Sequence, residues 1–549
     1  MSNPDQSAVL LDIRNLFVKL PKGAERTHAV EDISCALNRN EILCVVGESG
    51  SGKSITARAI MGLLPAPHVM VDQGDIHFNG ENLTTVKESR MREIRGGEIS
   101  MIFQEPMTAL NPVMTIGNQI DEVIRFHTKI KKKHRRQQAL DLISSVHLPD
   151  PQHVIRAYPH ELSGGQRQRA MIAMALAMEP KILIADEPTT ALDVTTQAQI
   201  LKLIKELQVD HDTGVLFITH DFGVVADIAD RVAVMQHGKI VEIGKTSQVL
   251  NNPQHPYTQG LMRAVPSLTP PAVRDISDNE ELSVNKLTKT YKSGGSWFGL
   301  GAKERIVHAT DEVSIRLHKG ETLGVVGESG SGKSTLARCI VRLINAEEGE
   351  ILYKGVDLRP LNRKQMRPYR SKIQMVFQDP FASLNPRSKV GRIIADGPRI
   401  LGVASTEADK RAKEMLELVG LDERAFDRFP HEFSGGQRQR IGIARALALD
   451  PEILVADEPV SALDVSIQAQ ILQLLADIRE RLQLSMIFIT HDLRVAAQVC
   501  DRIAVMKLGK IVEAGPTSTL FANAEHAYTR ELLNAVPGRD WHPQRSETL

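Results

Sequence analysis

The chain has 549 residues, which is more than one ordinary hydrophobic core serves and predicts at least two domains. Lysine plus arginine and aspartate plus glutamate both number 67, and this balance argues against a general nucleic-acid-binding protein. No signal peptide is recognisable, and no apolar stretch approaches the roughly 20 residues of a membrane-spanning helix. The four cysteines are widely spaced, so we expect buried thiols in a reducing compartment and no zinc or iron–sulfur site.

The N-terminal part of the chain predicts a phosphate-binding loop. LDIRNLFVKL at 11–20 alternates apolar and polar residues as an edge β-strand would. EILCVV at 41–46 predicts a buried strand, followed by GESGSGKS at 47–54 and an apolar helix pattern. GxxxxGK[ST] between a strand and a helix is the P-loop, whose backbone N–H groups and helix N-terminus bind phosphates. We expect Lys53 to reach the β- and γ-phosphates and Ser54 to ligate Mg²⁺.

The middle of the domain adds the carboxylates that hydrolysis requires. KIKKKHRR at 129–136 is the densest basic run, and we interpret it as a solvated face of a helix or loop. KILIAD at 181–186 is a buried strand that ends in an aspartate, the Walker B pattern, which brings Asp186 to Mg²⁺. Glu187 follows and is placed to orient and deprotonate the attacking water. VLFITH at 215–220 contains a third buried strand.

The second half of the chain repeats the first. SGGQRQR occurs at 163–169 and 434–440, and ADEP and ITHD recur at the same spacing, while GESGSGKS recurs at 327–334. LSVNKLTKTY at 282–291 restarts the pattern of the first strand. This is a tandem duplication of an α/β domain, because strands alternate with helices as in a largely parallel sheet. The second copy supplies Lys333, Ser334, Asp457 and Glu458.

The duplication sets the expected domain limits. A proline-containing, partly acidic stretch at 266–281 suits an exposed linker. We therefore expect a first domain over 1–265, a second over 282–537 and a flexible tail over 538–549.

LSGGQ at 162–166 and FSGGQ at 433–437 are the signature of ATP-binding cassette (ABC) ATPases, which both halves resemble over nearly their whole length. The resemblance implies two tandem ABC-type P-loop domains, each with a mostly parallel core sheet, an antiparallel β edge and a helical signature subdomain. Further cassette motifs occur in order: the Q-loop glutamines Gln104 and Gln378, the D-loops at 190–193 and 461–464, and the switch histidines His220 and His491.

The resemblance also implies how the halves cooperate. In this family the signature motif completes the ATP site of the opposite domain, so two cassettes close head to tail over two ATP molecules. The switch histidine contacts the γ-phosphate, and the Q-loop senses Mg²⁺ and touches a membrane subunit. One composite site would combine Lys53, Asp186, Glu187 and His220 with Ser434 and Gly436. The other would combine Lys333, Asp457, Glu458 and His491 with Ser163 and Gly165.

The resemblance assigns three sets of site residues, with ATP and Mg²⁺ as cofactors. The catalytic set is Glu187, His220, Glu458 and His491. The Mg²⁺ set is Ser54, Gln104, Asp186, Ser334, Gln378 and Asp457. The ATP-binding set is Gly47, Glu48, Ser49, Gly50, Ser51, Gly52, Lys53, Ser54, Ile55, Gln104, Ser163, Gly164, Gly165, Gln166, Tyr291, Gly327, Glu328, Ser329, Gly330, Ser331, Gly332, Lys333, Ser334, Thr335, Gln378, Ser434, Gly435, Gly436 and Gln437.

The halves depart from each other at one position of this pattern. Tyr291 stands where cassettes place an aromatic residue to stack on adenine. In the first half Leu20 occupies this place, and Phe17 is close in sequence but out of register. We therefore expect unequal adenine stacking at the two sites.

The segment after each cassette indicates the branch of the family. HPYTQGLMRAVP at 255–266 and HAYTRELLNAVP at 526–537 resemble the tail of ATPases that import oligopeptides, dipeptides and nickel. QEPMTALNP at 104–112 and QDPFASLNP at 378–386 are similar to the same family. Some relatives carry a cysteine cluster beside the tail, which this chain lacks, and Ala527 replaces the proline of the first copy.

This resemblance implies the energy-coupling ATPase of an ABC importer for peptides or a related solute, peripheral on the cytoplasmic face of the plasma membrane. The expected partners are two membrane permeases and an extracytoplasmic solute-binding protein, with one copy of the chain per transporter and no nucleic acid. Dipeptides, longer or murein peptides, glutathione, nickel chelates and opines remain open as cargo. Two other cassette classes are alternatives. A ribosome-binding translation factor would show a long charged linker, and a DNA-repair cassette would carry zinc cysteines.

Overall fold

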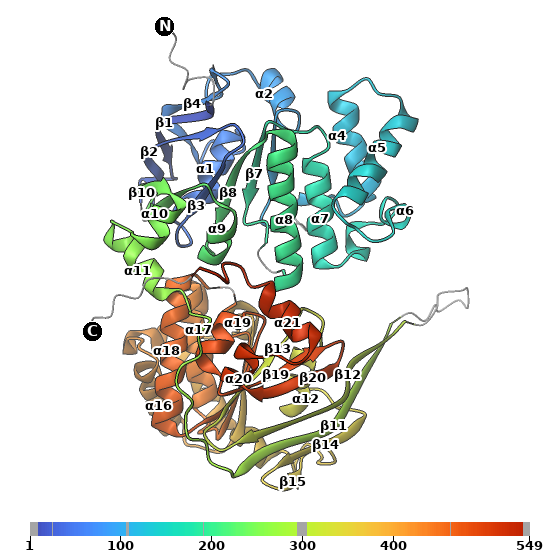
Figure 1. Cartoon of the computed structure of the whole chain (residues 1–549). Helices are drawn as coiled ribbons and strands as arrows, with labels where there is room; N and C mark the ends of the chain where they lie inside the picture. Colours follow the sequence, from blue (N-terminus) through green and yellow to red (C-terminus); the bar gives the residue numbers. More distant parts are fainter. Residues whose placement is uncertain are drawn as a thin grey trace. The chain divides into compact units, whose positions relative to one another are not determined.

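The computed structural model describes residues 9–24, 26–105, 109–189, 192–293, 305–461 and 463–541. The chain divides into two compact units (Figure 1): Met1–Val265 with Pro537–Leu549, and Pro266–Val536. This division groups the predicted linker with the second unit and the end of the chain with the first. The expected limits of the linker and cassettes stay a prediction. Residues 542–549 of the predicted tail lie outside the described residues.

A core sheet positions the motifs of the first unit. It is parallel except for its last hairpin, and its central strands are buried along their full length because both faces are covered. Buried strands of this kind are near-continuous runs of valine, isoleucine and leucine, as the sequence showed. In spatial order, the strands found within the described residues are β10 (Lys239–Lys245), β9 (Arg231–Gln236), β3 (Ile42–Val46), β8 (Gly214–Thr219), β7 (Ile182–Asp186) and β6 (Ile99–Ile102).

An antiparallel sheet accompanies the core sheet. Its order is β2 (His28–Asn38), β1 (Val9–Lys19), β4 (Met70–Phe78) and β5 (Glu81–Asn82). The expectation of an edge strand at 11–20 was wrong, because β1 pairs with β2 on one side and β4 on the other. The alternation has another cause: side chains such as Ile13 and Val18 are buried in the core, whereas Arg14 and Lys19, which follow them, are exposed.

The second unit repeats both sheets. β11 (Glu280–Ser293) is again an inner strand, paired on both sides, so the edge expectation for 282–291 was also wrong. The core sheet runs β16 (Ile373–Val376), β17 (Ile453–Asp457), β18 (Ser485–Thr490), β13 (Thr322–Val326), β19 (Arg502–Lys507) and β20 (Lys510–Pro516). The antiparallel sheet runs β12 (Arg305–His318), β11 (Glu280–Ser293), β14 (Glu348–Tyr353) and β15 (Val356–Asp357).

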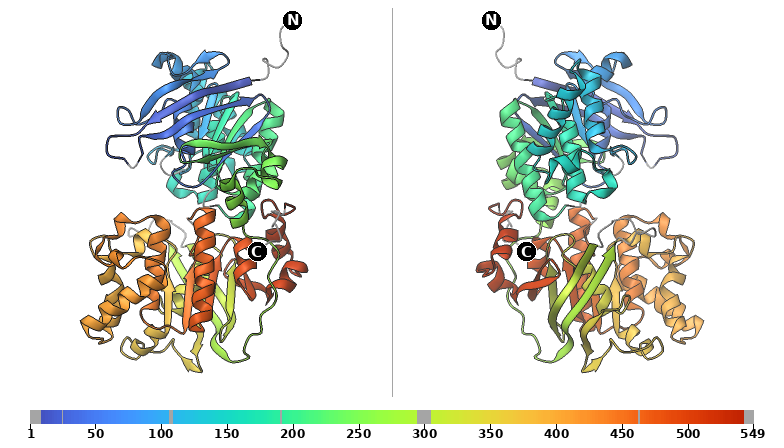
Figure 2. Two further views of the ribbon diagram at one scale, coloured as in Figure 1. Left: turned by 90° about the vertical axis from the view of Figure 1, so that its left-hand side faces the viewer. Right: turned by 90° about the vertical axis from the view of Figure 1, so that its right-hand side faces the viewer.

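Helices flank each core sheet. In the second unit, Figure 2 shows the helical subdomain (orange) on one side of the sheet and the C-terminal helices (red) on the other. The helices that the site uses in the first unit are α1 (Lys53–Ile60), α4 (Ile116–His127), α5 (Lys132–Ser145), α7 (Gly164–Ala175), α8 (Val194–His211), α9 (Phe222–Ile228) and α11 (Pro256–Ala264). Their counterparts in the second unit are α12 (Lys333–Ile340), α15 (Val390–Ile400), α16 (Ser405–Leu418), α17 (Gly435–Leu447), α18 (Val465–Leu482), α19 (Leu493–Val499) and α21 (Ala527–Asn534).

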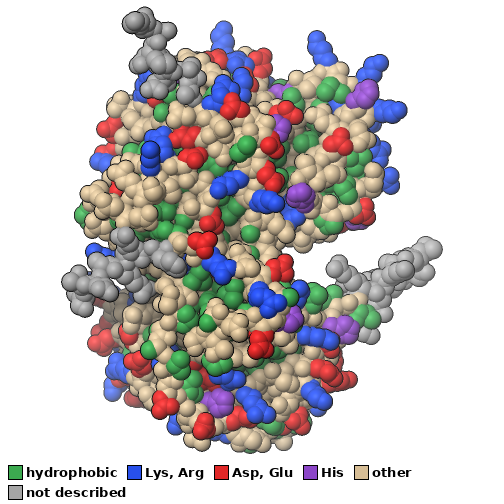
Figure 3. Space-filling view, viewed as in Figure 1, with side chains coloured by type: hydrophobic (Ala, Val, Ile, Leu, Met, Phe, Trp, Pro, Cys, Tyr) green, Lys and Arg blue, Asp and Glu red, His purple; other side chains and the backbone are tan. Residues whose placement is uncertain are grey.

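The surface agrees with the balanced composition. Lysine and arginine side chains are interspersed with aspartate and glutamate over the face drawn in Figure 3. The basic run at 129–136 is exposed except for Arg135, whose guanidinium pairs with Asp121 at 2.7 Å. Cys44, Cys339 and Cys500 are buried. Within the described ranges, no helix is both long and apolar enough to cross a membrane, and no group of three or more His, Cys, Asp or Glu side chains is arranged to hold a metal by itself.

Candidate active sites

The first P-loop joins β3 to α1 and is held by its own lysine. Lys53 Nζ donates to the carbonyl oxygens of Gly47 at 2.7 Å and Glu48 at 2.9 Å. The lysine is buried, so its ammonium sits inside the loop at the N-terminus of the helix. A buried cation and the N–H groups of a helix N-terminus at one point are the elements that bind a polyphosphate.

The second P-loop, between β13 and α12, has the same geometry. Lys333 Nζ donates to Gly327 O at 2.7 Å and to Glu328 O at 2.8 Å. Lys333 is buried to the same extent as Lys53, with 5 % of its surface exposed. In both units the P-loop therefore connects a buried strand to a helix, and its lysine is hydrogen-bonded within the loop.

A serine and a buried aspartate meet beside each loop. Ser54 Oγ donates to Asp186 Oδ1 at 2.8 Å, and Ser334 Oγ donates to Asp457 Oδ1 at 2.9 Å. Burial raises the pKa of both aspartates, although the serine hydrogen bonds oppose the shift. Hydroxyl and carboxylate oxygens are the hard ligands that Mg²⁺ takes, and a divalent cation would compensate the buried charge. The donor set therefore fits Mg²⁺.

The Glu187 carboxylate, which follows β7, is contacted by the predicted Q-loop glutamine and switch histidine of its unit. Gln104 Nε2 donates to Glu187 Oε2 at 2.8 Å, and His220 Nδ1 lies 3.4 Å from Glu187 Oε1. Glu187 adopts a left-handed φ of 48°, and its N–H donates to Ile218 O at 2.9 Å. A non-glycine residue at positive φ is costly, and such strain gathers at functional sites. The segments that carry Gln104, Glu187 and His220 are far apart in sequence, and they meet at this one carboxylate.

Glu458 repeats this arrangement in the second unit. Gln378 Nε2 donates to its Oε2 at 2.7 Å, and His491 Nδ1 lies 3.2 Å from its Oε1. Burial acts to raise the pKa of Glu458, but the hydrogen bond and charge of His491 outweigh it and leave the pKa lowered. Burial likewise acts to lower the pKa of His491, and Glu458 reverses this to a raised value. The two groups stabilise each other's charged forms.

This pair predicts a pH-dependent contribution to stability. The lowered pKa of Glu458 gives stability that is fully present above the ordinary value of 4.5, and the raised pKa of His491 gives stability fully present below 6.5. His491→Gln should therefore destabilise the second unit most between pH 4.5 and 6.5, by about 1.5–3 kcal/mol. The difference from the parent should shrink as the pH rises through the raised pKa of His491.

The measurement is chemical unfolding of the full chain at several pH values. His308→Gln is the control, because that histidine is exposed on β12 and contacts the hydroxyl of Thr290, away from the Glu458 carboxylate. A pH-independent difference between His491→Gln and the parent would show that the ion pair does not form.

The signature motifs begin helices in both units. Ser163 and Ser434 are N-caps whose hydroxyls accept from the N–H groups of Gln166 and Gln437 at 3.3 Å, and each glutamine side chain accepts in return from its serine N–H at 3.0 Å. Both serines are exposed, so the capped N-termini of α7 and α17 are open to solvent within their own units. Asp193 caps α8 at the end of the first D-loop. D-loop residues Thr190, Ala191 and Ala462 lie outside the described residues.

The adenine position differs between the units. Tyr291 is 43 % exposed, and Lys289 Nζ lies 5.5 Å from its ring centre, whereas Leu20 packs against the core. Phe17 makes an edge contact with His28 at 5.6 Å. The first unit also places Arg26 on its P-loop, where a guanidinium nitrogen donates to Gly50 O at 2.6 Å.

The sequence did not predict this arginine, because it lies in a turn between two strands and belongs to no motif. A second contact that the sequence missed involves the tail tyrosines Tyr257 and Tyr528, which hydrogen-bond to the P-loops. The occurrence of YT in both tails was the signal that could have found it.

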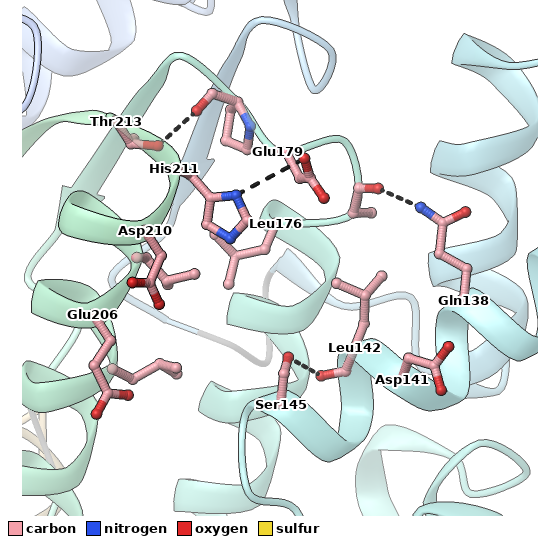
Figure 4. A pocket seen from close by; sticks show the side chains of 14 residues that line it. Gln138, Asp141, Leu142, Ser145, Leu176, Glu179, Glu206, Asp210, His211 and Thr213 are labelled. Carbon is pink, nitrogen blue, oxygen red and sulfur yellow. Dashed lines mark hydrogen bonds and ion pairs between the residues drawn. The ribbon is translucent and has the colours of Figure 1, made fainter.

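A cavity of about 370 Å³ in the first unit is separate from these motifs (Figure 4). It lies between α5, α7 and α8, and His211 at its wall faces Glu179 at 3.8 Å. None of the predicted site residues lines it. The predicted site residues therefore lie at the P-loops and not in this cavity.

Family models agree with the geometry. The model described as ABC transporter matches residues 30–190 and 310–461. The model described as oligopeptide/dipeptide transporter, C-terminal region, matches residues 241–293 and 512–548. Each match occurs twice, once in each half of the chain.

Several curated proteins resemble the whole chain. Peptidoglycan transport ATP-binding protein YejF of Agrobacterium fabrum is 47 % identical, covering 96 % of each chain. Glutathione import ATP-binding protein GsiA of Salmonella choleraesuis is 45 % identical, covering 97 % of this chain and 90 % of the relative. Among solved structures, "Dimeric Structure of MJ0796, a Bacterial ABC Transporter Cassette" is 28 % identical, with a TM-score of 0.40, and covers 43 % of this chain and 99 % of that chain.

Proposed function

The chain belongs to the ABC transporter family and is an ATPase with two cassettes, and from this premise we propose that it drives the import of peptides or a related small solute. The observation that carries the proposal is that both units hold a complete set of hydrolytic residues, while both tails match the oligopeptide/dipeptide transporter region. Relatives named for peptidoglycan and glutathione transport support a peptide-like cargo.

The residues divide the work of hydrolysis. Lys53 and Lys333 bind the β- and γ-phosphates of the substrate ATP. The serine–aspartate pairs and the Q-loop glutamines would hold Mg²⁺, which would supply charge neutralisation when bound. Glu187 and Glu458 orient the attacking water and accept its proton, and the switch histidines hold those carboxylates. The two composite sites, with Ser434 serving Lys53 and Ser163 serving Lys333, remain a prediction from the family resemblance.

The cassette pair would close when it binds ATP and reopen after hydrolysis, and this cycle would supply the motive force. ATP stabilises the closed state because it binds that state more tightly than the open state. We propose two membrane permeases and an extracytoplasmic solute-binding protein as partners, and attachment at the cytoplasmic face of the membrane. The tether between cassettes gives each a high effective concentration of the other, so one copy per transporter suffices.

The test is reconstitution. The chain is purified with the permeases and binding protein encoded beside it and placed in liposomes, where peptide uptake and peptide-stimulated ATPase activity are measured. We expect both activities to require ATP and the binding protein. Failure to associate with any permease, together with co-sedimentation with ribosomes, would overturn the importer proposal and favour a translation factor.

The difference at Tyr291 predicts unequal nucleotide affinity. Aromatic stacking on a base is worth about 1–3 kcal/mol, so Tyr291→Ala should weaken ATP binding at the Lys333 P-loop several-fold or more. Leu20→Ala should change binding at the Lys53 P-loop less, because leucine offers only apolar contact. Calorimetric ATP titration of the full chain measures both. An aromatic side chain stacked on the adenine held by Lys53 in an experimental structure would contradict the prediction.

A further inference from the structure

The tail helix of each unit contacts the P-loop of the same unit through a tyrosine hydroxyl. Glu48 N–H donates to Tyr257 Oη at 3.2 Å in the first unit, and Glu328 N–H donates to Tyr528 Oη at 3.3 Å in the second. The two tyrosines are the matching residues of HPYT and HAYT. Because the contact recurs in both units, it is a property of the tail and not an accident of one loop.

The tail is fixed before it reaches the first P-loop. The Glu242 carboxylate on β10 accepts from the N–H groups of Gln254 at 2.8 Å and His255 at 3.1 Å. The His255 ring then caps α11 by accepting from Tyr257 N–H at 3.2 Å. These bonds set the start of the helix, and therefore the place from which the tyrosine projects.

The second tail is fixed in the same way. The Glu513 carboxylate on β20 accepts from the N–H groups of Glu525 at 2.7 Å and His526 at 3.2 Å, and His526 accepts from Tyr528 N–H at 3.1 Å. Tyr528 is 3 % exposed, and Lys507 Nζ lies 4.1 Å from its ring centre. The tyrosine is therefore oriented from two sides.

The P-loop residue that is hydrogen-bonded to the tail tyrosine is also hydrogen-bonded to the P-loop lysine. Glu48 donates its N–H to Tyr257 and accepts at its carbonyl from Lys53 Nζ at 2.9 Å and Ser51 N–H at 3.1 Å. In the second unit, Glu328 O accepts from Lys333 Nζ at 2.8 Å. One backbone residue thus stands between the tail hydroxyl and the cation that binds phosphate.

We propose that Tyr257 and Tyr528 are positioning residues for the P-loop lysines and set the ATP affinity of their cassettes. The tyrosines would act through the Glu48 and Glu328 peptides, to which their hydroxyls are hydrogen-bonded. The peptide-importer tail thereby becomes a component of the nucleotide site. The inference rests on the proposed function, since it assumes that these P-loops bind ATP.

The test compares Tyr257→Phe, Tyr528→Phe and the double variant in the full chain, because phenylalanine keeps the ring and removes only the hydroxyl. A net hydrogen bond of ordinary strength predicts a rise of about two- to tenfold in the ATP Kd of the affected site. Calorimetric titration with Mg-ATP should show one weakened site in each single variant and two in the double variant. In steady-state hydrolysis, KM should rise while kcat changes less than twofold.

Tyr353→Phe is the matched control. It removes a hydroxyl that donates to Glu452 at 2.6 Å, remote from the P-loop, so it should lower the melting temperature without changing the ATP Kd. If the double variant loses thermal stability as the control does but keeps its ATP Kd and KM within twofold of the parent, the tyrosines are structural only and the inference is overturned. If the parent chain binds no ATP, the proposed function itself fails, and the two failures are distinguishable.

Discussion

Replacing Glu458 with glutamine slows ATP hydrolysis by about 10²–10⁴-fold in our expectation, because the amide cannot accept a proton from water. The surrounding side chains keep this carboxylate ionised and in place. The charge of His491 keeps its pKa lowered despite burial, and Gln378 fixes the second oxygen at 2.7 Å. Glutamine preserves the size of the side chain, so the loss should fall on turnover and leave ATP binding within a few-fold of the parent.

Glu187→Gln carries the same expectation for the first unit. Its carboxylate has the same neighbours, Gln104 and His220, and the same left-handed backbone as Glu458. Phosphate release by the assembled transporter should therefore fall sharply in either single variant. Full activity in one of them would show that its site is not required, and the two sites would then be unequal in catalysis.

Glu480→Gln is the control for both. Its carboxylate is 72 % exposed on α18, where it lies 3.7 Å from Arg479, so turnover should be unchanged. Equal ATP titrations for all variants would confirm that the slowed reactions reflect chemistry and not lost nucleotide.

The motifs were predictable from sequence because each depends on a local spacing. The α/β fold, the doubling of the domain and the strands that end at Asp186 and Asp457 are confirmed by the structure. A buried strand of a parallel sheet brings its last residue to the crevice where ligands bind. The local sequence pattern therefore also predicts where that residue lies in the fold. Whether the assigned residues act as predicted stays open to the experiments above.

Long-range placement was not predictable in the same way. The alternation of apolar and polar residues in β1 shows that one face of the strand is buried. It does not distinguish an inner strand from an edge strand, because either kind can have one buried and one exposed face. The contact of Tyr257 with Glu48 joins residues 209 positions apart, and nothing in either local pattern requires it. Arg26 reaches Gly50 from a turn for the same reason. Such contacts depend on how helices, strands and turns pack in the folded unit, which a local sequence pattern does not specify.

A large structural effect is expected at the first glycine of the second P-loop. Gly327 has a φ of +151°, and a Cβ atom there would lie 2.1 Å from the carbonyl oxygen of Met506 on β19. Backbone of a central strand cannot move aside as a flexible side chain can. Gly327→Ala therefore combines positive-φ strain of about 1–2 kcal/mol with overpacking of about 1–3 kcal/mol.

Gly330→Ala separates these two causes within the same loop. Gly330 also has a positive φ, of +80°, but a Cβ atom there would meet nothing within 4 Å. This variant should lose only the strain, about 1–2 kcal/mol, whereas Gly327→Ala should lose about 2–5 kcal/mol. Displacing the Gly327 carbonyl also disturbs one of the carbonyl acceptors of Lys333 Nζ, at 2.7 Å, so ATP affinity at this loop should fall by more in Gly327→Ala. Chemical unfolding and Mg-ATP titration of the full chain measure both quantities. Equal stability of the two variants would mean that the loop can move away from β19, and the close approach of Gly327 to Met506 would then not constrain the P-loop.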